Sequence, residues 1–363
     1  MDLDDTCGAK GGDGMGVTMN DVSRHAGVSV ATVSNVITGK KPVSEKKRKL
    51  VLDSIEALGY QVNLVARGLK TQHTSILGLI LPDITKLFFQ NVIAGITDAA
   101  SQRGYRLNIL SSGYNFDSER ALVNLLTSSR VDGIILDSCV ADDASDGWLE
   151  ALTSGRSKAS PVVLLENTFH SDRISSVSVD NASCSRSITQ HLFDVGRRRV
   201  LYLAGPLHLE HELARLTGYI QCHEQNGVPR APELEMHGTF MSESGYLAVV
   251  DALKRGVRFD AVQASNDQSA IGALKALEEF GLRVPEDVAV TGFDNLFPST
   301  LVTPALTTIS IPNYDMGVRA VDVVLRQIEE PDAAPVQVRM EWQMIVRAST
   351  CAQMQTDWNL NGW

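Results

Sequence analysis

The sequence contains no long apolar run. None of its hydrophobic stretches approaches the roughly 20 residues that a helix needs to cross a bilayer, and residues 1–17 lack the apolar core of a signal peptide. We therefore expect a cytoplasmic protein that does not contact the membrane. The five cysteines are odd in number, widely spread and without a CxxC pair. This usage fits a reducing compartment and argues against a disulfide framework or a zinc finger.

The common signatures of catalysis are also missing. No Ser-His-Asp or paired-carboxylate arrangement stands out, and the GGDGMG run at 11–16 neither follows a strand nor begins a phosphate-binding helix. No G-x-G-x-x-G fingerprint occupies a strand–helix junction. We predict no enzymatic activity, no cofactor and no metal. The HLEHE segment at 208–212 leaves three interpretations open: a metal site, a solvated loop, or contact of His208 or His211 with a ligand.

The net charge of −10 is unevenly distributed. Residues 18–73 contain nine Lys/Arg and four Asp/Glu, a balance of +5, whereas residues 74–363 contain 23 and 35, a balance of −12; residues 1–17 supply the remaining −3. A small basic head on a large acidic body is typical of a phosphate-contacting module joined to a sensor. The KKRK run at 46–49, taken alone, could be an ordinary solvated helix face.

The stretch from Thr18 to Gly39 predicts two short helices joined by a tight turn. Thr18 and Ser29 are suited to cap their N-termini, and Gly27 suits the turn between them. The outer face of the second helix would consist of small or polar side chains, namely Ala31, Ser34, Asn35 and Thr38. This pattern matches a helix-turn-helix, whose second helix enters the DNA major groove. The alternative is a helical hairpin with a solvated face.

A third helix is predicted from the Ser44 cap to Gly59. The three helices would share one small core, formed by Val22, Val33, Ile37, Val51 and Ile55. The Gly-rich and acidic residues 1–17 are expected to be a disordered tail.

From Ser75 onward the pattern changes to alternating strands and helices. The predicted strands are SILGLIL, YRLNIL, GIILDS, PVVLLE, RVLYLAG, AVQASN and VAVTGFD, and helical periods cover 117–129, 183–196, 213–226, 242–255 and 267–280. Such alternation indicates parallel α/β units, too many for one sheet of usual size. We predict two open α/β lobes with a ligand cleft between the carboxyl ends of their strands.

The chain resembles the LacI/GalR family of bacterial transcription regulators over about residues 18–350. The resemblance rests on VTMNDVSRHAGVSVATVSNVITG, VSEKKRKLVLDSIEALGY and NLVARGLKT, and then on LGLILPDI, VDGIIL, SVDN, LYLAGP, ARLTGY, ASNDQSAIGALKAL, VPEDVAVTGFDN, TPALTTI and IVRAST. It implies a multidomain protein, with an all-α helix-turn-helix head and a two-lobed α/β body like that of periplasmic sugar-binding proteins.

The resemblance also implies domain bounds and partners. The head would span 18–62, a hinge 63–74, and an effector-binding and dimerisation domain 75–363. Lobe 1 would comprise about 75–178 and 309–335, and lobe 2 about 179–308 and 336–363. The expected partners are palindromic double-stranded operator DNA, a sugar-like effector that controls operator affinity, and a second copy of the chain in a homodimer or tetramer. The protein would act as a repressor.

By position in the family, the DNA-contacting residues are Thr18, Ser29, Val30, Ala31, Thr32, Ser34, Asn35, Asn63, Arg67, Leu69 and Lys70. The family's hinge becomes helical on the operator and wedges a leucine into the minor groove, and that residue would be Leu69; interdomain packing is the alternative. Asn35 stands where the family has Arg or another long side chain, which favours adenine over guanine. Val62 replaces the family's Pro, and Gly68 lies inside the hinge, where it disfavours a helix.

The effector-binding residues implied by the resemblance are Phe88, Phe89, Arg215, Phe240, Asn266, Asp267 and Asp294. Aromatic rings stack on the C–H face of a sugar, and Arg and Asp bind its hydroxyls. A salt bridge or a helix cap remains the alternative for Arg215 and Asp294, and a core position for Phe88 and Phe240. The family's Asn-Pro before the Phe pair is replaced by Lys86-Leu87.

Two other classes of protein are weighed against a regulator. A solute-binding protein would share the two-lobed body. The missing signal peptide and the basic head argue against this class. A doubly wound enzyme would need the missing fingerprint. The identity of the effector, and whether it acts as inducer or corepressor, stay open.

Overall fold

The computed structural model describes residues 17–39, 41–60, 73–139, 160–167 and 174–352. The chain divides into two compact units, 1–74 and 75–363, here called the head and the body. The expected tail before residue 17 lies outside the described residues. So do the hinge residues Val62, Asn63, Arg67, Gly68, Leu69 and Lys70.

The head consists of three helices, α1 (Met19–Ala26), α2 (Val30–Thr38) and α3 (Glu45–Leu58). At the start of α1, the Thr18 hydroxyl accepts from the Asp21 amide, and the Asp21 carboxylate accepts from the Thr18 amide, so each satisfies a backbone group of the other. The Ser29 hydroxyl caps α2 by accepting from the Thr32 amide. The prediction for Ser44 is only half right: it lies at the N-cap position of α3 but makes no side-chain capping bond.

The core of the head contains the five predicted residues and two further buried side chains. Val22, Val33 and Val51 are fully buried, and Ile37 and Ile55 pack against them. Ala26 of α1 and Tyr60, which follows α3, are also buried in this cluster.

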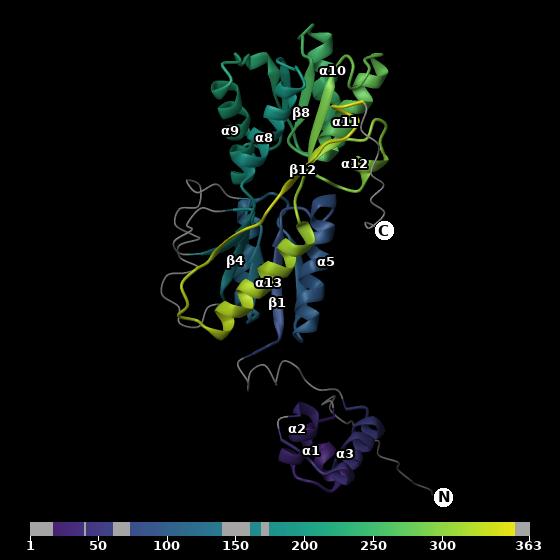
Figure 1. The fold of residues 1–363 in the computed structure, drawn as a ribbon. Helices are drawn as coiled ribbons and strands as arrows, with labels where there is room; N and C mark the ends of the chain where they lie inside the picture. The colour runs from purple at the N-terminus through teal and green to yellow at the C-terminus, as the bar shows by residue number, and fades with distance from the viewer. Residues whose placement is uncertain (1–16, 40, 61–72, 140–159, 168–173, 353–363) are drawn as a thin grey trace, which may run out of the picture. The chain divides into compact units, whose positions relative to one another are not determined.

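The body contains two six-stranded sheets that define two lobes (Figure 1). The first-lobe elements are β1 (Ile76–Leu81), α5 (Leu87–Gln102), β2 (Arg106–Ser111), α6 (Phe116–Ser128), β3 (Gly133–Leu136), β4 (Val162–Leu165), β5 (Ser175–Ser178), α13 (Asn313–Glu329) and β11 (Gln337–Arg339). The second-lobe elements are α8 (Asn181–Asp194), β6 (Val200–Ala204), α9 (Glu210–Gln225), a 3-10 turn η2 (Pro232–Leu234), β7 (Glu235–His237), α10 (Ser242–Lys254), β8 (Ala261–Ala264), α11 (Asp267–Glu279), β9 (Ala289–Asp294), α12 (Pro298–Leu301), β10 (Thr307–Ser310) and β12 (Gln343–Ile345).

Both sheets are built from parallel crossovers. The first-lobe order is β11-β5-β4-β3-β1-β2, with every pairing parallel. The second-lobe order is β12-β10-β9-β8-β6-β7, in which β12 alone runs antiparallel. The predicted fold class, a helix-turn-helix head followed by a two-lobed α/β body, is confirmed.

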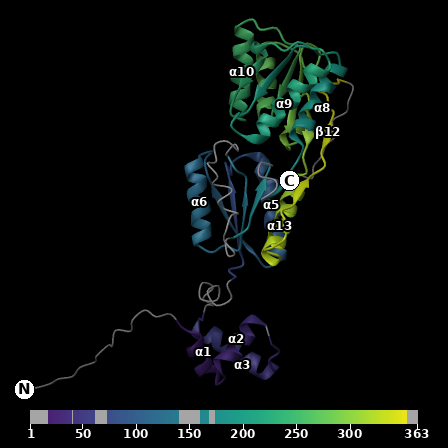
Figure 2. The ribbon, with the colours of Figure 1, turned by 90° about the vertical axis from the view of Figure 1, so that its left-hand side faces the viewer.

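Helices cover both faces of each sheet. Figure 2 shows α6 on one side of the first-lobe sheet and α5 and α13 on the other. Alternate residues of β1 serve the two faces: Ile80 packs with the α6 side chains, and Leu79 packs with those of α5 and α13. This two-sided burial explains why the strands read as continuous apolar runs. Among the described residues, no helix is long and apolar enough to span a membrane.

The lobe boundaries differ slightly from the expected ones. Because β10 ends at Ser310 within the second-lobe sheet, the chain crosses to the first lobe after that residue, two residues beyond the expected crossing at about 308. Because β11 pairs with β5, the return crossing follows Arg339 and not residue 335. Short edge strands such as β11 carry too few apolar residues to be assigned to a lobe from the sequence.

Candidate functional site

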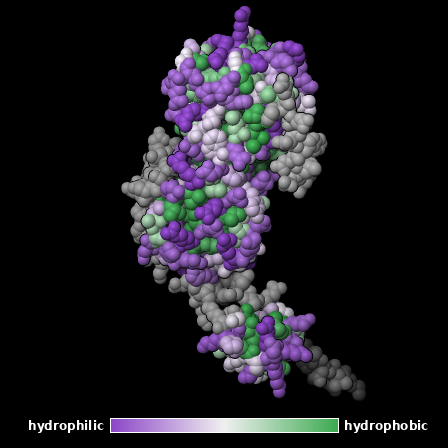
Figure 3. Space-filling model, in the orientation of Figure 1, coloured by the Kyte–Doolittle hydropathy of each residue, from purple (hydrophilic) through white to green (hydrophobic). Residues whose placement is uncertain are grey.

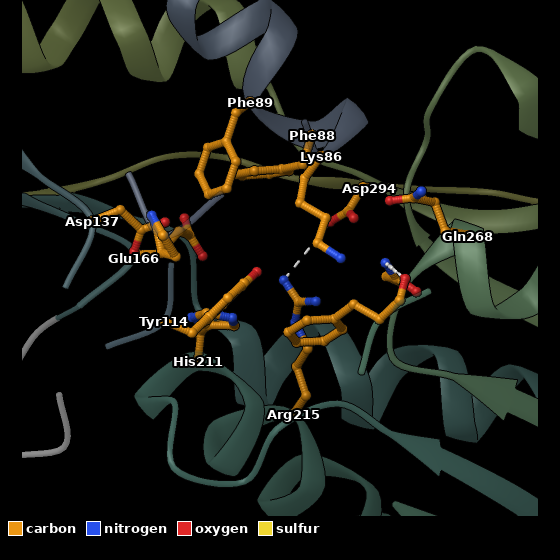
Figure 4. Close-up of a pocket in the computed structure, with 13 residues that line it drawn as sticks. Lys86, Phe88, Phe89, Tyr114, Asp137, Glu166, His211, Arg215, Gln268 and Asp294 are labelled. Carbon is orange, nitrogen blue, oxygen red and sulfur yellow. Dashed lines mark hydrogen bonds and ion pairs between the residues drawn. The ribbon is translucent and has the colours of Figure 1, made fainter. Parts of the chain in front are cut away.

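A cleft lies between the two lobes, at the carboxyl ends of their strands (Figure 4). Its empty space is about 510 Å³, opening included, which is within the usual range for small-molecule sites. The lining residues are Pro82, Lys86, Phe88, Phe89, Tyr114, Asp137, Glu166, His211, Arg215, Phe240, Asn266, Gln268 and Asp294. The parallel topology explains the location, because all strands of such a sheet deliver their following loops to the same edge.

Arg215 is the central cation of the cleft. It projects from α9 and is 4% exposed. Its Nε donates to Asn181 Oδ1 at 2.8 Å, its Nη1 donates to the Ser265 carbonyl at 2.7 Å, and its guanidinium carbon lies 3.7 Å from the centre of the Phe293 ring. Its Nη2 stands 3.8 Å from Asp294 Oδ1, too far for a direct hydrogen bond. The guanidinium is therefore held rigidly while donors on its outer edge face the cavity.

Aromatic side chains form two walls. Phe88 and Phe89 come from the first turn of α5, with their rings edge to face and 5.1 Å apart. In the second lobe, the Phe240 ring stacks on His211 at 5.9 Å. Gly205 makes room for Phe240, since a Cβ at that position would lie 2.1 Å from the ring. Burial lowers the pKa of His211 to about 3, so its imidazole is neutral.

Three buried carboxyl groups face the cavity: Asp137, Glu166 and Asp294. Burial raises the pKa of each above its usual range, most strongly for Asp137 and Asp294. The nearby Arg215 opposes the rise in all three. The cleft is thus rich in hydrogen-bond acceptors, and it suits a ligand with several donor groups.

The backbone around the cleft is strained. Seven described residues other than glycine have a positive φ, and four of them line the cavity, namely Tyr114 (56°), Glu166 (57°), Phe240 (62°) and Asp294 (102°). Such conformations cost of order 1–3 kcal/mol each and concentrate at functional sites, where they aim a side chain.

The outer side of α2 forms a second candidate site in the head. Val33 is buried, whereas Val30 is 39% exposed and Ala31 is also exposed. Ser34 and Asn35 are half-buried on the same helix. An exposed face of small apolar and amide side chains can approach base edges, where Asn pairs with adenine and Val contacts a thymine methyl group. The basic run Lys46, Lys47, Arg48 and Lys49 is exposed along α3 and adds charge suited to phosphates.

Comparison with known families identifies both units. Residues 18–63 match the family described as bacterial regulatory proteins, lacI family, and residues 74–347 match the periplasmic binding proteins and sugar binding domain of the LacI family. The chain belongs to the LacI family. It is a DNA-binding transcriptional repressor with an effector-binding domain, and its relatives are regulators rather than enzymes.

Relatives match this LacI-family chain along nearly its whole length. Catabolite control protein A of Priestia megaterium is 32% identical over 93% of this chain and 100% of its own. The PurR repressor of Proteus mirabilis is 32% identical over 88% of this chain and 94% of its own. Among solved structures, the Lac repressor dimer bound to operator and the anti-inducer ONPF has a TM-score of 0.83 at 27% identity, covering 93% of this chain and 99% of that one. The CelR–cellobiose complex has a TM-score of 0.69 at 29% identity, covering 92% of this chain and 99% of that one.

Six of the seven effector residues expected from the sequence line the cleft: Phe88, Phe89, Arg215, Phe240, Asn266 and Asp294. The Asn266 side chain also caps α11 and donates to the Phe240 carbonyl. Asp267 does not line it. Its fully buried carboxylate accepts from the Thr308 hydroxyl at 2.6 Å and the Leu296 amide at 2.7 Å, and it packs against Gly292. This carboxylate therefore links the start of α11 to β9 and β10. The next residue, Gln268, lines the cavity instead.

Several lining residues were not expected from the sequence. Asp137 and Glu166 directly follow buried strands, and Asp294 is the last residue of another. An acidic residue at the end of a predicted strand could therefore have identified Asp137 and Glu166 from the sequence. Lys86 and Tyr114 come from loops without such a signal. In HLEHE, His211 lines the cavity and His208 does not. Within the part of the chain that the structure describes, no group of three His, Cys, Asp or Glu side chains could hold a metal ion.

Proposed function

We propose that the protein binds palindromic operator DNA as a homodimer and that a sugar-like effector in the cleft controls its affinity for that operator. The observation that carries the effector class is the combination of acceptor-rich and aromatic walls in one cavity. Carboxylates accept from sugar hydroxyls, and ring faces such as that of Phe88 stack on the C–H face of a pyranose. The CelR relative is bound to cellobiose, which supports the same class of ligand.

A homodimer is supported by the related Lac repressor dimer and by the surface of the first lobe. Figure 3 shows apolar residues gathered in the middle of one face of this lobe, in the area that α13 occupies in Figure 1. Tyr314 of α13 is 42% exposed, and Ile109 of the edge strand β2 is 40% exposed. Apolar patches of this kind are often interfaces. A dimer also presents two heads to the half-sites of a palindrome. Because its target is DNA, we propose that the protein acts in the bacterial cytoplasm.

Coupling would follow from the position of the cleft between the lobes. A ligand that contacts Phe88 in one lobe and Arg215 in the other can favour one lobe arrangement only by its difference in affinity for the two. We propose that the change reaches the operator through residues 63–74 and the wedge residue Leu69.

The test is an operator titration of the full chain with and without sugars. A DNA duplex would first be selected from a random pool, and its affinity measured by fluorescence anisotropy in the presence of cellobiose and of common monosaccharides. We expect at least one sugar to change the affinity severalfold. Failure of every sugar to bind or to act would contradict the proposed effector class.

Two variants separate the two ends of the molecule. Asp294→Ala should weaken effector binding by about 1.5–3 kcal/mol, the contribution of a hydrogen bond to a charged group, and remove the operator response at effector concentrations that just saturate the parent. Leu69→Ala should weaken operator binding and leave effector affinity unchanged. If Asp294→Ala responds to the effector like the parent, the proposed position of the effector is wrong.

A further inference from the structure

Two acidic side chains at the first-lobe end of the cleft come from neighbouring strands. Asp137 directly follows β3 and Glu166 directly follows β4, and these strands pair in parallel with Leu136 opposite Leu164. This register places Asp137 opposite Leu165, the residue before Glu166, so the two acids leave neighbouring strands at the same edge of the sheet. Figure 4 shows them together at one end of the cavity. We call them the acidic pair.

The acidic pair is almost completely buried and incompletely bonded. Asp137 is 2% exposed and Glu166 is 4% exposed. Asp137 Oδ1 and Glu166 Oε1 accept no hydrogen bond from any described residue. The other Glu166 oxygen, Oε2, accepts from Asn181 Nδ2 at 2.9 Å. Since a buried carboxylate without a partner is costly, an arrangement that points two such oxygens into a cavity indicates a missing ligand group.

The basic side chains of the cleft are engaged elsewhere. Arg215 bonds Asn181 and the Ser265 carbonyl and turns its remaining edge toward Asp294. The Lys86 Nζ donates to Met241 Sδ at 2.6 Å and lies 3.9 Å from Asp83 Oδ2. Asp83 does not line the cavity. Within the described ranges, no ion pair joins a basic group to either member of the acidic pair.

We propose that the effector carries an ammonium group that binds the acidic pair, which makes it an amino sugar. This inference rests on the proposed function of the cleft and narrows the ligand class. A neutral hydroxyl donates one hydrogen bond and brings no charge, whereas an ammonium group brings three donors and a compensating positive charge. The remaining hydroxyls of the sugar face Arg215, Asp294 and the aromatic walls.

The experiment compares matched sugars by calorimetry on the full chain. Each set contains a neutral sugar, its 2-amino-2-deoxy analogue and the N-acetylated form of that analogue, which keeps the nitrogen but removes the charge. The sets are D-glucose, D-galactose and D-mannose with their derivatives, and cellobiose with the corresponding β-1,4-linked glucosamine disaccharides. In at least one set we expect the amine to bind about tenfold or more tightly than both uncharged members, as for a charge-assisted bond in a buried site.

Charge-removing variants locate the preference. Asp137→Asn and Glu166→Gln retain the shape of the side chains, so each should reduce the preference for the amine over its uncharged partners to about threefold or less. Asp117→Asn is the matched control, because Asp117 is an exposed acid of α6 in the same lobe and outside the cavity. It should leave the preference unchanged.

The outcomes distinguish the two proposals. If an uncharged sugar binds as tightly as its amine in every set that binds, the ammonium assignment is overturned and the sugar-like effector stands. If an amine is preferred but Asp137→Asn and Glu166→Gln leave the preference intact, the acidic pair does not bind it and the assignment is also overturned. If no member of any set binds, both the amino sugar and the sugar-like effector are overturned.

Discussion

Two fully buried carboxyl groups near the cleft, Glu212 and Asp267, make stability depend on pH. Burial is the main cause that raises the pKa of each to about 7, from ordinary values of 4.5 and 3.8. The folded protein therefore retains protons over a pH range in which the unfolded chain has lost them. Because unfolding then releases protons, the free energy of unfolding falls as the pH rises from about 4 to about 7, and it levels off above that.

Replacement of Glu212 by Gln should flatten this pH dependence. The Gln amide oxygen can still accept from the Tyr202 hydroxyl, which donates to Glu212 at 3.1 Å, while the titrating proton is removed. Urea unfolding between pH 5 and 8 should show a slope reduced by up to about 1.4 kcal/mol per pH unit, which corresponds to one proton. Glu224→Gln, an exposed change on the same helix, serves as the control. An unchanged slope for Glu212→Gln would place the titration on another group.

Asn35 on α2 should determine the base at one position of each half-site. Asn35→Ala should reduce discrimination at that position by about 1–3 kcal/mol and leave nonspecific binding nearly unchanged. Lys47→Ala, on the exposed basic side of α3, should instead weaken all DNA sequences alike. Competition titrations against the four base substitutions measure both effects. Equal loss of specific and nonspecific affinity in Asn35→Ala would make Asn35 a phosphate or folding residue.

At the level of elements, helical periodicity and strand-length apolar runs predicted most helices and strands of the body. The expected helices at 117–129, 242–255 and 267–280 correspond to α6, α10 and α11 within one residue at each end. The strand β5, with the sequence SSVS, was not predicted, because its buried serines give no hydrophobic pattern in the sequence. Their hydroxyls are satisfied by partners distant in sequence, such as Gln337 and Gln327. Only the assembled sheet brings those partners to β5.

Close packing of α5 on α13 depends on two glycines. A Cβ on Gly317 would lie 2.3 Å from the Val92 carbonyl oxygen, and a Cβ on Gly95 would lie 2.0 Å from the Tyr314 carbonyl oxygen. Gly317→Ala should therefore lower the free energy of unfolding by about 1–3 kcal/mol, because rigid backbone must move to admit the methyl group. Thermal and urea unfolding would measure the loss, with Arg319→Gln on the exposed side of α13 as the control. A stabilised Gly317→Ala variant would contradict the tight helix contact.

At the scale of the whole molecule, the separation of charge predicts a steep salt dependence of DNA binding. The balance of +5 over residues 18–73 and −12 over residues 74–363 confines attraction for phosphates to the head. The logarithm of the association constant should fall with the logarithm of salt concentration, with a slope of about −0.9 for each neutralised phosphate. Replacing Lys46 and Lys49 together by Ala should reduce the magnitude of that slope by about 0.9 for each lysine that contacts a phosphate. An affinity that does not change with salt would contradict an electrostatic head.

The sequence by itself determined the order and type of most elements, the two units and the family. These properties depend on local signals: N-cap residues such as Thr18, C-cap glycines such as Gly27, and apolar residues that recur with the period of a helix or strand. It also identified six cleft residues, among them Arg215 and Asp294, through a resemblance that keeps the family's motifs in order.

Only the tertiary structure decided which buried acidic residues face the cavity and which stabilise the fold. Asp267 and Asp294 both lie at strand–helix junctions, yet one braces three elements and the other faces the cavity. Asp137 and Glu166 become a pair because parallel strands β3 and β4, which are far apart in sequence, deliver them to one edge. A side chain's surroundings depend on contacts between distant segments, and local patterns in the sequence do not encode those contacts.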